Sequence, residues 1–383
     1  MGPIIYLDNS ATTAVLPEVV KAMTKMLEIN YGNPSSLHGL GLKAEKALNE
    51  ARYQVAKLID ADTSEIYFTS GGTEANNWVL YGLTKARQRQ GKHIITTSIE
   101  HSSVLAACKR LETEGFEVTY LPVNSDGVIS LKDVESSLRK ETILVSIMSV
   151  NNEMGSQQPI AEIADLVHKK SKAVLHVDHV QGYGKIPLNC HRENIDLMSI
   201  SSHKIHGPKG TGALYVRKGL HIEPFMVGGN QENGKRSGTE NTAGIVGFGV
   251  AAKLAGNNFE ERVAKMREFK VTLAHQLIND IPNTYINGPE PEKGAPHILS
   301  VSFPGIRAEI LIHMLEQKGV YVSTGSACHS RFEGASHVLK ALKLSPEHLE
   351  GTIRISLGAL NTQEQIEPTV AALKECVSEL RAL

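Results

Sequence analysis

Lys204 stands in a sequence context typical of a reactive amine. Residues 201–210 read SSHKIHGPKG, so this lysine lies between an apolar run and a Gly-Pro turn. Most lysines lie on solvated faces, whereas an enclosed lysine has a lowered pKa and supplies a neutral amine that can form a Schiff base with an aldehyde. Lys209 fits this role less well because it lies within the turn. A surface loop with two charges is the alternative interpretation.

Two more titratable side chains follow predicted strands. Asp178 ends the run AVLHVD, where a partly desolvated carboxylate needs a cationic or N–H partner, such as a protonated pyridine nitrogen. The alternative is an aspartate that caps a helix. His101 follows HIITTSIE, where a histidine could stack on a flat ring or transfer protons near neutral pH. A lone histidine is more often structural, so a functional role for His101 depends on the residues around it.

A third cluster, residues 69–77, reads TSGGTEANN and follows a predicted strand. Its two glycines allow close backbone approach, and the N–H groups at a helix start favour an anion such as phosphate. Thr73 adds a hydroxyl. The cluster is neither a Walker A loop nor GxGxxG, and a plain strand-to-helix turn is an equally good interpretation.

Among the four cysteines, Cys328 is the candidate nucleophile. Its neighbours in STGSACHSR are small, polar and basic, which favours an exposed thiol with thiolate character. Cys108 and Cys376 lie in apolar helical contexts and are predicted to be small core residues, whereas Cys190 has no motif around it. Arg354 interrupts the strand-like run GTIRISLG and could clamp a carboxylate, although an arginine paired at the surface is the alternative.

The composition excludes several classes of protein. The 383 residues include 40 basic and 41 acidic side chains, a balance that gives no electrostatic footprint for nucleic acid or an anionic membrane. No apolar run reaches the roughly 18–20 residues of a membrane span, and no signal peptide is evident. Four cysteines without a CxxC pair exclude a disulfide framework and a cysteine-built zinc site. We therefore expect a cytoplasmic protein.

The elements that must position these residues form an α/β pattern. Seven β-rich runs alternate with helical stretches, which predicts a mostly parallel seven-stranded sheet with helices on both faces. Ligands bind such sheets at the carboxyl ends of the strands. The seven predicted strands are 65–69, 93–97, 118–123, 143–150, 173–178, 197–201 and 213–216.

The pattern changes near residue 255, and the length indicates two domains. We predict a large domain over 16–255, and a smaller α+β domain that combines 1–15 with 256–383 and carries the Cys328 loop. Helical spacing of Leu48, Ala51, Val55 and Leu58 predicts one amphipathic helix. The same spacing of Val370, Leu373, Val377 and Leu380 predicts a final helix, with Thr362 and Gln365 spaced as a capping box.

Taken together, these residues resemble the cysteine desulfurases of the NifS/IscS type, which are fold-type I pyridoxal-phosphate enzymes. The resemblance runs nearly end to end, and SxHKxxGPKG together with GSAC is its most specific part. The other matching segments are YLDNSATT at 6–13, YGNPSS at 31–36, VNNEMG at 150–155 and RSGT at 236–239.

The resemblance implies a role for each candidate residue. Lys204 would carry pyridoxal phosphate, Asp178 would pair with the pyridinium nitrogen, Gln181 would bind the ring hydroxyl, and His101 would stack on the ring and move protons. The phosphate would lie on Gly72, Thr73, Ser201 and His203, with Thr239 reaching in from the other subunit of a homodimer. Asn152, beside the cofactor, and Arg354 would hold the substrate carboxylate.

The implied reaction removes sulfur from L-cysteine. Lys204 would take the α-proton, and the Cys328 thiolate would attack the substrate sulfur, leaving a persulfide on the enzyme and releasing alanine. A protein acceptor would then take the sulfur, either an iron–sulfur scaffold or a tRNA- or cofactor-thiolation enzyme.

Other functions remain open at this point. Glu100 with His101, Asp178 with His179, and His203 with His206 provide the ligand types of a metal-dependent hydrolase. A non-catalytic binding protein with a degenerate pyridoxal fold is a second alternative. Within the same fold, an aminotransferase has no use for Cys328, whereas a selenocysteine lyase could share every residue named.

Overall fold

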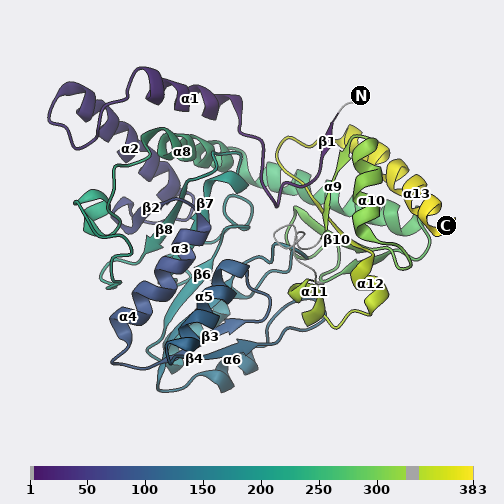
Figure 1. The fold of residues 1–383 in the computed structure, drawn as a ribbon, viewed down its shortest axis with the longest axis horizontal. Coiled ribbons are helices and arrows are strands. Elements are labelled where there is room, and N and C mark those ends of the chain that lie inside the picture. The colour runs from purple at the N-terminus through teal and green to yellow at the C-terminus, as the bar shows by residue number, and fades with distance from the viewer. Residues whose placement is uncertain (1–3, 325–335, 383) are drawn as a thin grey trace.

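The structure is a computed structural model that describes residues 4–324 and 336–382. Two groups of elements lie side by side (Figure 1), one around a seven-stranded sheet and one around a four-stranded sheet. The larger group contains the helices α1 Pro17–Glu28, α2 Gly39–Lys57, α3 Gly72–Trp78, α4 Thr84–Arg87, α5 Ser102–Thr113, α6 Leu131–Ser137, α7 Ile160–Lys170 and α8 Thr242–Gly256. The smaller group contains α9 Phe259–Asp280, α10 Ala308–Gln317, α11 His337–Ala341, α12 Pro346–Glu350 and α13 Ile366–Ala382.

The large sheet confirms the predicted mostly parallel arrangement. Its strand order is β2-β8-β7-β6-β5-β3-β4, and only β8 runs antiparallel to its two neighbours. Every predicted strand overlaps an observed one. The strands are β2 Ile66–Thr69, β3 His93–Thr97, β4 Glu117–Leu121, β5 Thr142–Met148, β6 Val174–Asp178, β7 Leu197–Ser201 and β8 Gly212–Val216.

Helices cover both faces of this sheet, because its central strands are buried on both sides. On one face, Leu175 and Val177 of β6 belong to a core that includes residues of α2, α7 and α8. On the other face, Val174 belongs to a core formed with residues of α3 and α5. The alternation of neighbouring residues between two cores follows from the two-residue period of a strand.

The smaller sheet is antiparallel and has its own apolar core with α9, α10 and α13. Its order is β12-β13-β10-β9, formed by β9 Tyr285–Asn287, β10 Ile298–Ser302, β12 Ser323–Thr324 and β13 Thr352–Ser356. The N-terminal strand β1 Ile5–Tyr6 pairs in parallel with β11 Val320–Tyr321, so the chain begins beside this smaller group. The predicted capping box of Thr362 and Gln365 is present just before α13.

The domain boundary near residue 255 stays a prediction. It falls between α8, whose residues pack into the core of the large sheet, and α9, whose residues pack into the core of the small sheet. Across the described ranges 4–324 and 336–382, every helix is too short or too polar to cross a membrane.

The close approach of α2 and α8 gives a test of the packing. A Cβ added at Gly249 of α8 would lie 2.4 Å from Cα of Ala51, whereas one added at Gly39 of α2 would meet no atom within 4 Å. We expect Gly249→Ala to lower the free energy of unfolding by about 1–3 kcal/mol through overpacking. Gly39→Ala is the matched control and should change it little. Urea titration measures both, and equal effects would contradict the packing described here.

Candidate active site

A cavity of about 370 Å³ lies at the carboxyl edge of the large sheet. Residues that follow β2, β3, β5, β6 and β7 line it, as expected where parallel strands end. It brings together ten of the predicted site residues, namely Gly72, Thr73, His101, Asn152, Asp178, Gln181, Ser201, His203, Lys204 and Arg354.

Lys204 lies half-buried in a short 3₁₀ turn directly after β7. Its Nζ donates hydrogen bonds to the carbonyl oxygens of Ser10 at 2.5 Å and Ala11 at 2.7 Å. The turn is held from the same side, because Thr13 Oγ1 donates to the carbonyl of His203 at 2.9 Å. The N-terminal segment therefore fixes the lysine at the cavity wall, a contact that residue types alone did not predict.

Asp178 is buried at the end of β6 and its carboxylate has two N–H partners. The amide Nδ2 of Asn76 donates to Oδ2 at 2.7 Å, and the backbone N–H of Val180 donates to Oδ1 at 3.0 Å. Asn76 received no role from the sequence, although it lies one helical turn after Gly72. Its position in the motif TSGGTEANN was the signal that could have identified it.

Asn76 also connects Asp178 to His101. The Asn76 amide donates to Ser103 Oγ at 2.9 Å, and Ser103 Oγ lies 2.8 Å from His101 Nδ1. This Nδ1 accepts from the backbone N–H of Ser103, so His101 is the N-cap of α5. Because Nδ1 is an acceptor, the neutral ring carries its proton on Nε2. The arrangement fixes both the orientation and the tautomer of the histidine.

Two buried polar atoms in the cavity wall fit a bound polar ring. Gln181 Nε2 donates to the Ser10 carbonyl at 3.0 Å, but within the described residues Gln181 Oε1 has no hydrogen-bond partner, and neither has Ser201 Oγ. Buried polar atoms in proteins are nearly always paired, so these two point to a ligand with complementary groups. Together with the Asp178 carboxylate in the same cavity, these polar groups fit pyridoxal phosphate.

Arg354 is buried on β13 at the side of the cavity formed by the smaller group. Its Nη2 donates to Asp8 Oδ1 at 2.7 Å, and its Nη1 donates to the backbone carbonyl of Asn152 at 3.0 Å. The guanidinium therefore already binds one carboxylate. The contact between Arg354 and Asn152 uses the peptide oxygen of Asn152 rather than its side-chain amide.

A second hollow of about 420 Å³ adjoins the first and is lined by the predicted phosphate contacts Gly72, Thr73, Ser201 and His203, together with Lys209. Burial and the neighbouring Lys204 and Lys209 charges lower the pKa of His203 to about 3, so its ring is neutral near pH 7. A neutral ring can donate one hydrogen bond to an anion without adding charge.

The comparisons with known proteins agree with this site. The aminotransferase class-V family matches residues 5–368. A cysteine desulfurase IscS of Methanosarcina thermophila is 45% identical over 98% of this chain and 93% of its own length. A solved NifS-like protein has a TM-score of 0.93 and 40% identity, covering 98% of this chain and all of its own. The structure of SspA in complex with cysteine has a TM-score of 0.83 and 36% identity, covering 94% of this chain and all of its own.

The chain belongs to the aminotransferase class-V family. Its full-length similarity to IscS and NifS-like proteins places it among the cysteine desulfurases of the NifS/IscS type, as predicted. Enzymes of this family depend on pyridoxal phosphate, and the polar groups of Asp178 and Gln181 in the cavity are consistent with that cofactor.

Two predicted residues of this desulfurase are not placed in the cavity. Thr239 is exposed and does not line the cavity, and its role in the other subunit stays a prediction. Cys328 lies outside the described residues. The remaining cysteines Cys108, Cys190 and Cys376 are buried, and burial raises the pKa of each thiol, which makes each a poor nucleophile.

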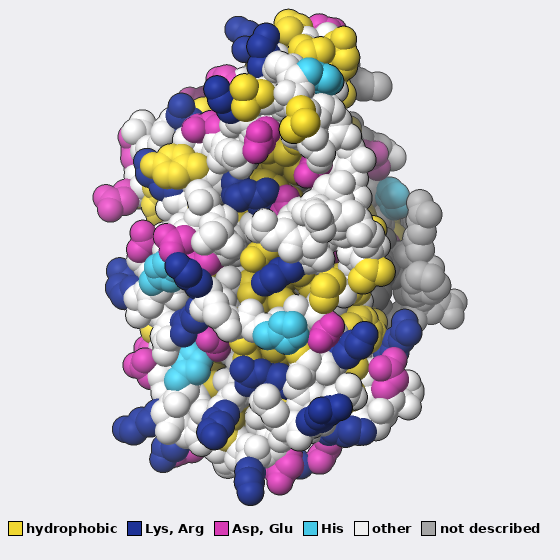
Figure 2. All heavy atoms as spheres, turned by 90° about the vertical axis from the view of Figure 1, so that its left-hand side faces the viewer, with side chains coloured by type: hydrophobic (Ala, Val, Ile, Leu, Met, Phe, Trp, Pro, Cys, Tyr) yellow, Lys and Arg dark blue, Asp and Glu magenta, His cyan; other side chains and the backbone are white. Residues whose placement is uncertain are grey.

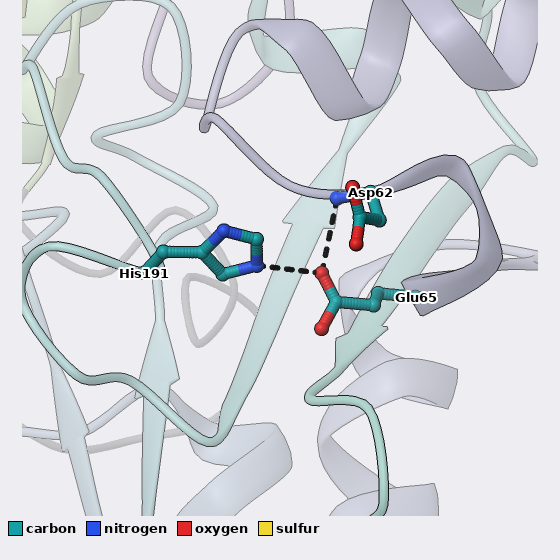
Figure 3. A group of neighbouring side chains, drawn as sticks. All are labelled: Asp62, Glu65 and His191. Carbon is teal, nitrogen blue, oxygen red and sulfur yellow. Dashed lines mark hydrogen bonds and ion pairs between the residues drawn. The ribbon is translucent and has the colours of Figure 1, made fainter.

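The predicted ligand pairs of a metal hydrolase do not form a metal centre in the described part of the desulfurase. The one cluster there with suitable spacing is Asp62, Glu65 and His191, whose ligand atoms lie within 4.8 Å of one another (Figure 3). Glu65 Oε2 already accepts from His191 Nε2 at 2.8 Å and from the Asp62 N–H at 3.0 Å, as part of a capping box. These contacts account for the cluster without an ion.

Glu100, next to His101, gives a test of the electrostatics around the site. Its Oε1 accepts from Thr97 Oγ1 at 2.8 Å and from the Met148 N–H at 2.9 Å, while burial raises the pKa of its carboxyl to about 8. The unfolded chain ionises this group near its ordinary value of 4.5, so it loses protons first and wild-type stability falls as the pH rises from 4.5 to about 8.

Glu100→Gln keeps the acceptor oxygen and removes the titration. We expect its free energy of unfolding to rise relative to wild type as the pH increases through this window, measured by urea titration at pH values of about 5 and about 8. The exposed Glu268 of α9 supplies the matched control Glu268→Gln. A pH-independent difference between Glu100→Gln and wild type would show that Glu100 does not titrate in this way.

Proposed function

We propose that this enzyme transfers the sulfur of L-cysteine to Cys328, releasing L-alanine. The convergence of Lys204, Asp178 and Arg354 on one cavity carries the proposal, because it provides an amine, an acid for a ring nitrogen and a carboxylate clamp within a single space. The related SspA, solved in complex with cysteine, supports this choice of substrate.

In the proposed site, Lys204 would hold the cofactor covalently and Asp178 would pair with the ring nitrogen of the cofactor. Gln181 would bind the ring hydroxyl, and the two hydrogen bonds that Asp178 accepts hold its carboxylate in place. Pyridoxal phosphate, when bound, supplies an electron sink for the substrate carbon. Gly72, Thr73, Ser201 and His203 hold the phosphate in the adjoining hollow.

Arg354 orients the substrate, with Asn152 beside it. The Arg354 guanidinium already binds the Asp8 carboxylate at 2.7 Å. The carboxylate of the substrate would therefore replace a group of the same charge on Arg354. Lys204, released from its covalent link when the substrate binds, would take the α-proton as a free amine. His101, held through Nδ1, presents Nε2 as its proton-transferring atom.

The sulfur transfer step is a displacement by a thiolate. Cys328 Sγ attacks the substrate sulfur, an S–S bond forms, and the bond between that sulfur and Cβ breaks. The electron pair of the broken bond stays with the substrate, whose carbon takes up a proton and becomes the methyl group of alanine. The high pKa values of the three buried thiols favour Cys328 as the nucleophile.

A homodimer and a protein acceptor complete the proposal. Figure 2 shows hydrophobic side chains gathered at the upper end of one face, the end at which Figure 1 places α1 and the start of α2. Exposed apolar residues of this region include Val20, Leu27, Ile29, Tyr31, Leu37 and Leu42. Such a surface is suited to a second copy, which would supply Thr239. The acceptor is an iron–sulfur scaffold or a thiolation enzyme, in the cytoplasm, where Cys328 stays reduced.

The assignment of Lys204 is tested by its chromophore. We expect Lys204→Ala to lose the visible absorbance that borohydride reduces, because the amine that binds the cofactor is gone. Lys218→Ala is the matched control, since Lys218 is an exposed lysine that lines neither hollow, and it should keep the chromophore. A reducible chromophore in Lys204→Ala would assign the linkage to another lysine.

The assignment of Cys328 is tested by the fate of sulfur. Cys328→Ala should keep the chromophore and lose at least about a hundredfold in sulfide and alanine release, because the attacking thiolate is absent. Mass spectrometry of wild type after exposure to L-cysteine should find one added sulfur on Cys328, with Cys108, Cys190 and Cys376 unmodified as internal controls. Full activity of Cys328→Ala would rule out the persulfide route.

A further inference from the structure

Glu74 places a negative charge where the cofactor phosphate is proposed to bind. It lines the hollow that Gly72, Thr73 and Ser201 also line. Burial alone would raise the pKa of Glu74, but the hydrogen bonds from Arg236 and Ser70 outweigh burial and hold the pKa below its ordinary value. The carboxylate is therefore charged near pH 7 and would repel a phosphate unless its charge is offset.

We propose that Arg236 is a positioning residue for the cofactor phosphate, which offsets the charge of Glu74 and fixes the turn that binds the phosphate. The inference rests on the proposed function, in which the phosphate lies on Gly72 and Thr73.

The geometry of the pair is a two-pronged ion pair. Arg236 Nε lies 2.8 Å from Glu74 Oε1, and Arg236 Nη2 lies 3.1 Å from Glu74 Oε2. The two side chains are only 20% and 9% exposed, so removing one partner leaves a poorly solvated charge on the other. Glu74 Oε2 also accepts from the backbone N–H of Ser70 at 2.8 Å, which ties the pair to the start of the glycine turn.

The same pair holds the segment that carries Thr239. Ser237 Oγ donates to the Gly229 carbonyl at 2.6 Å, and the Gly238 N–H donates to Gln231 Oε1 at 3.1 Å, so residues 229–238 form a closed loop. Arg236 fixes one end of this loop to α3, three residues before Thr239.

A second two-pronged pair fixes the middle of the loop. Arg52 of α2 donates to both carboxylate oxygens of Glu232, each at 2.7 Å, and Glu232 Oε2 also accepts from the Phe68 N–H of β2 at 2.9 Å. The first ion pair thus holds the loop against α3 and the second holds it against α2 and β2, but of the two acids only Glu74 lines the phosphate hollow. Arg52 therefore anchors the loop as Arg236 does, but its partner carries no charge into the phosphate hollow. This makes Arg52 the residue with which Arg236 can be compared.

The test compares two cofactors that differ only in the phosphate. We expect Arg236→Gln to weaken the binding of pyridoxal phosphate to the cofactor-free full chain by about tenfold or more, as expected when a buried charge loses its partner. The affinity for pyridoxal, which lacks the phosphate, should change less than about threefold. Absorbance titration measures both affinities.

The double variant Glu74→Gln/Arg236→Gln separates charge from structure. Because it removes the carboxylate as well, it should recover most of the lost affinity for pyridoxal phosphate, whereas a purely structural role of Arg236 predicts no recovery. Glu74→Gln alone keeps an oxygen for Ser70 and should bind pyridoxal phosphate at least as tightly as wild type. It tests the proposal even if Arg236→Gln does not fold.

Three results would overturn the inference: wild-type affinity for pyridoxal phosphate in Arg236→Gln, equal losses for both cofactors, or no recovery in the double variant. Thr73→Val tests the underlying placement separately. If it weakens pyridoxal phosphate but not pyridoxal, the phosphate position stands whatever Arg236 does. If it affects neither or both alike, the proposed phosphate position itself is wrong.

Discussion

A hydrogen-bonded chain from Asp178 through Asn76 and Ser103 to His101 is the interaction on which the site depends. A buried carboxylate is costly unless N–H groups or cations surround it. Asn76 supplies one such group and is linked through Ser103 Oγ to His101 Nδ1, while the backbone N–H of Ser103 sets the tautomer of that ring. One chain of polar contacts thus fixes the acid of β6 and the histidine at the start of α5 relative to each other.

The N-terminal segment has a comparable role for the amine. The strand Ile5–Tyr6 pairs with β11 of the smaller group, and the next residues cross to the large sheet, where the carbonyls of Ser10 and Ala11 hold Lys204. The segment therefore joins the smaller group to the lysine directly. A displacement of the smaller group would change the position of the amine as well as that of Arg354.

The sequence predicted the large sheet and most of the cavity wall for a physical reason. Runs rich in β-branched residues mark buried strands, and the carboxyl ends of parallel strands meet at one edge, so polar residues placed there must converge. The carbonyls of Ser10 and Ala11 were missed because a backbone oxygen leaves no signal in residue type. The Arg354–Asp8 and Arg236–Glu74 pairs were missed because their partners lie far apart in the chain, and no local pattern joins them.

The charges in the cavity wall explain why the site can accept a charged amino acid. Asp178 in the cavity wall has a donor from another segment, Asn76, and Asp8, which lies outside the wall, has Arg354. A substrate carboxylate that replaced Asp8 on Arg354 would leave the buried guanidinium paired before and after binding. Asp8 is only half-buried, so the carboxylate released by this exchange could be solvated by water. The exchange therefore avoids the cost of an unpaired buried charge.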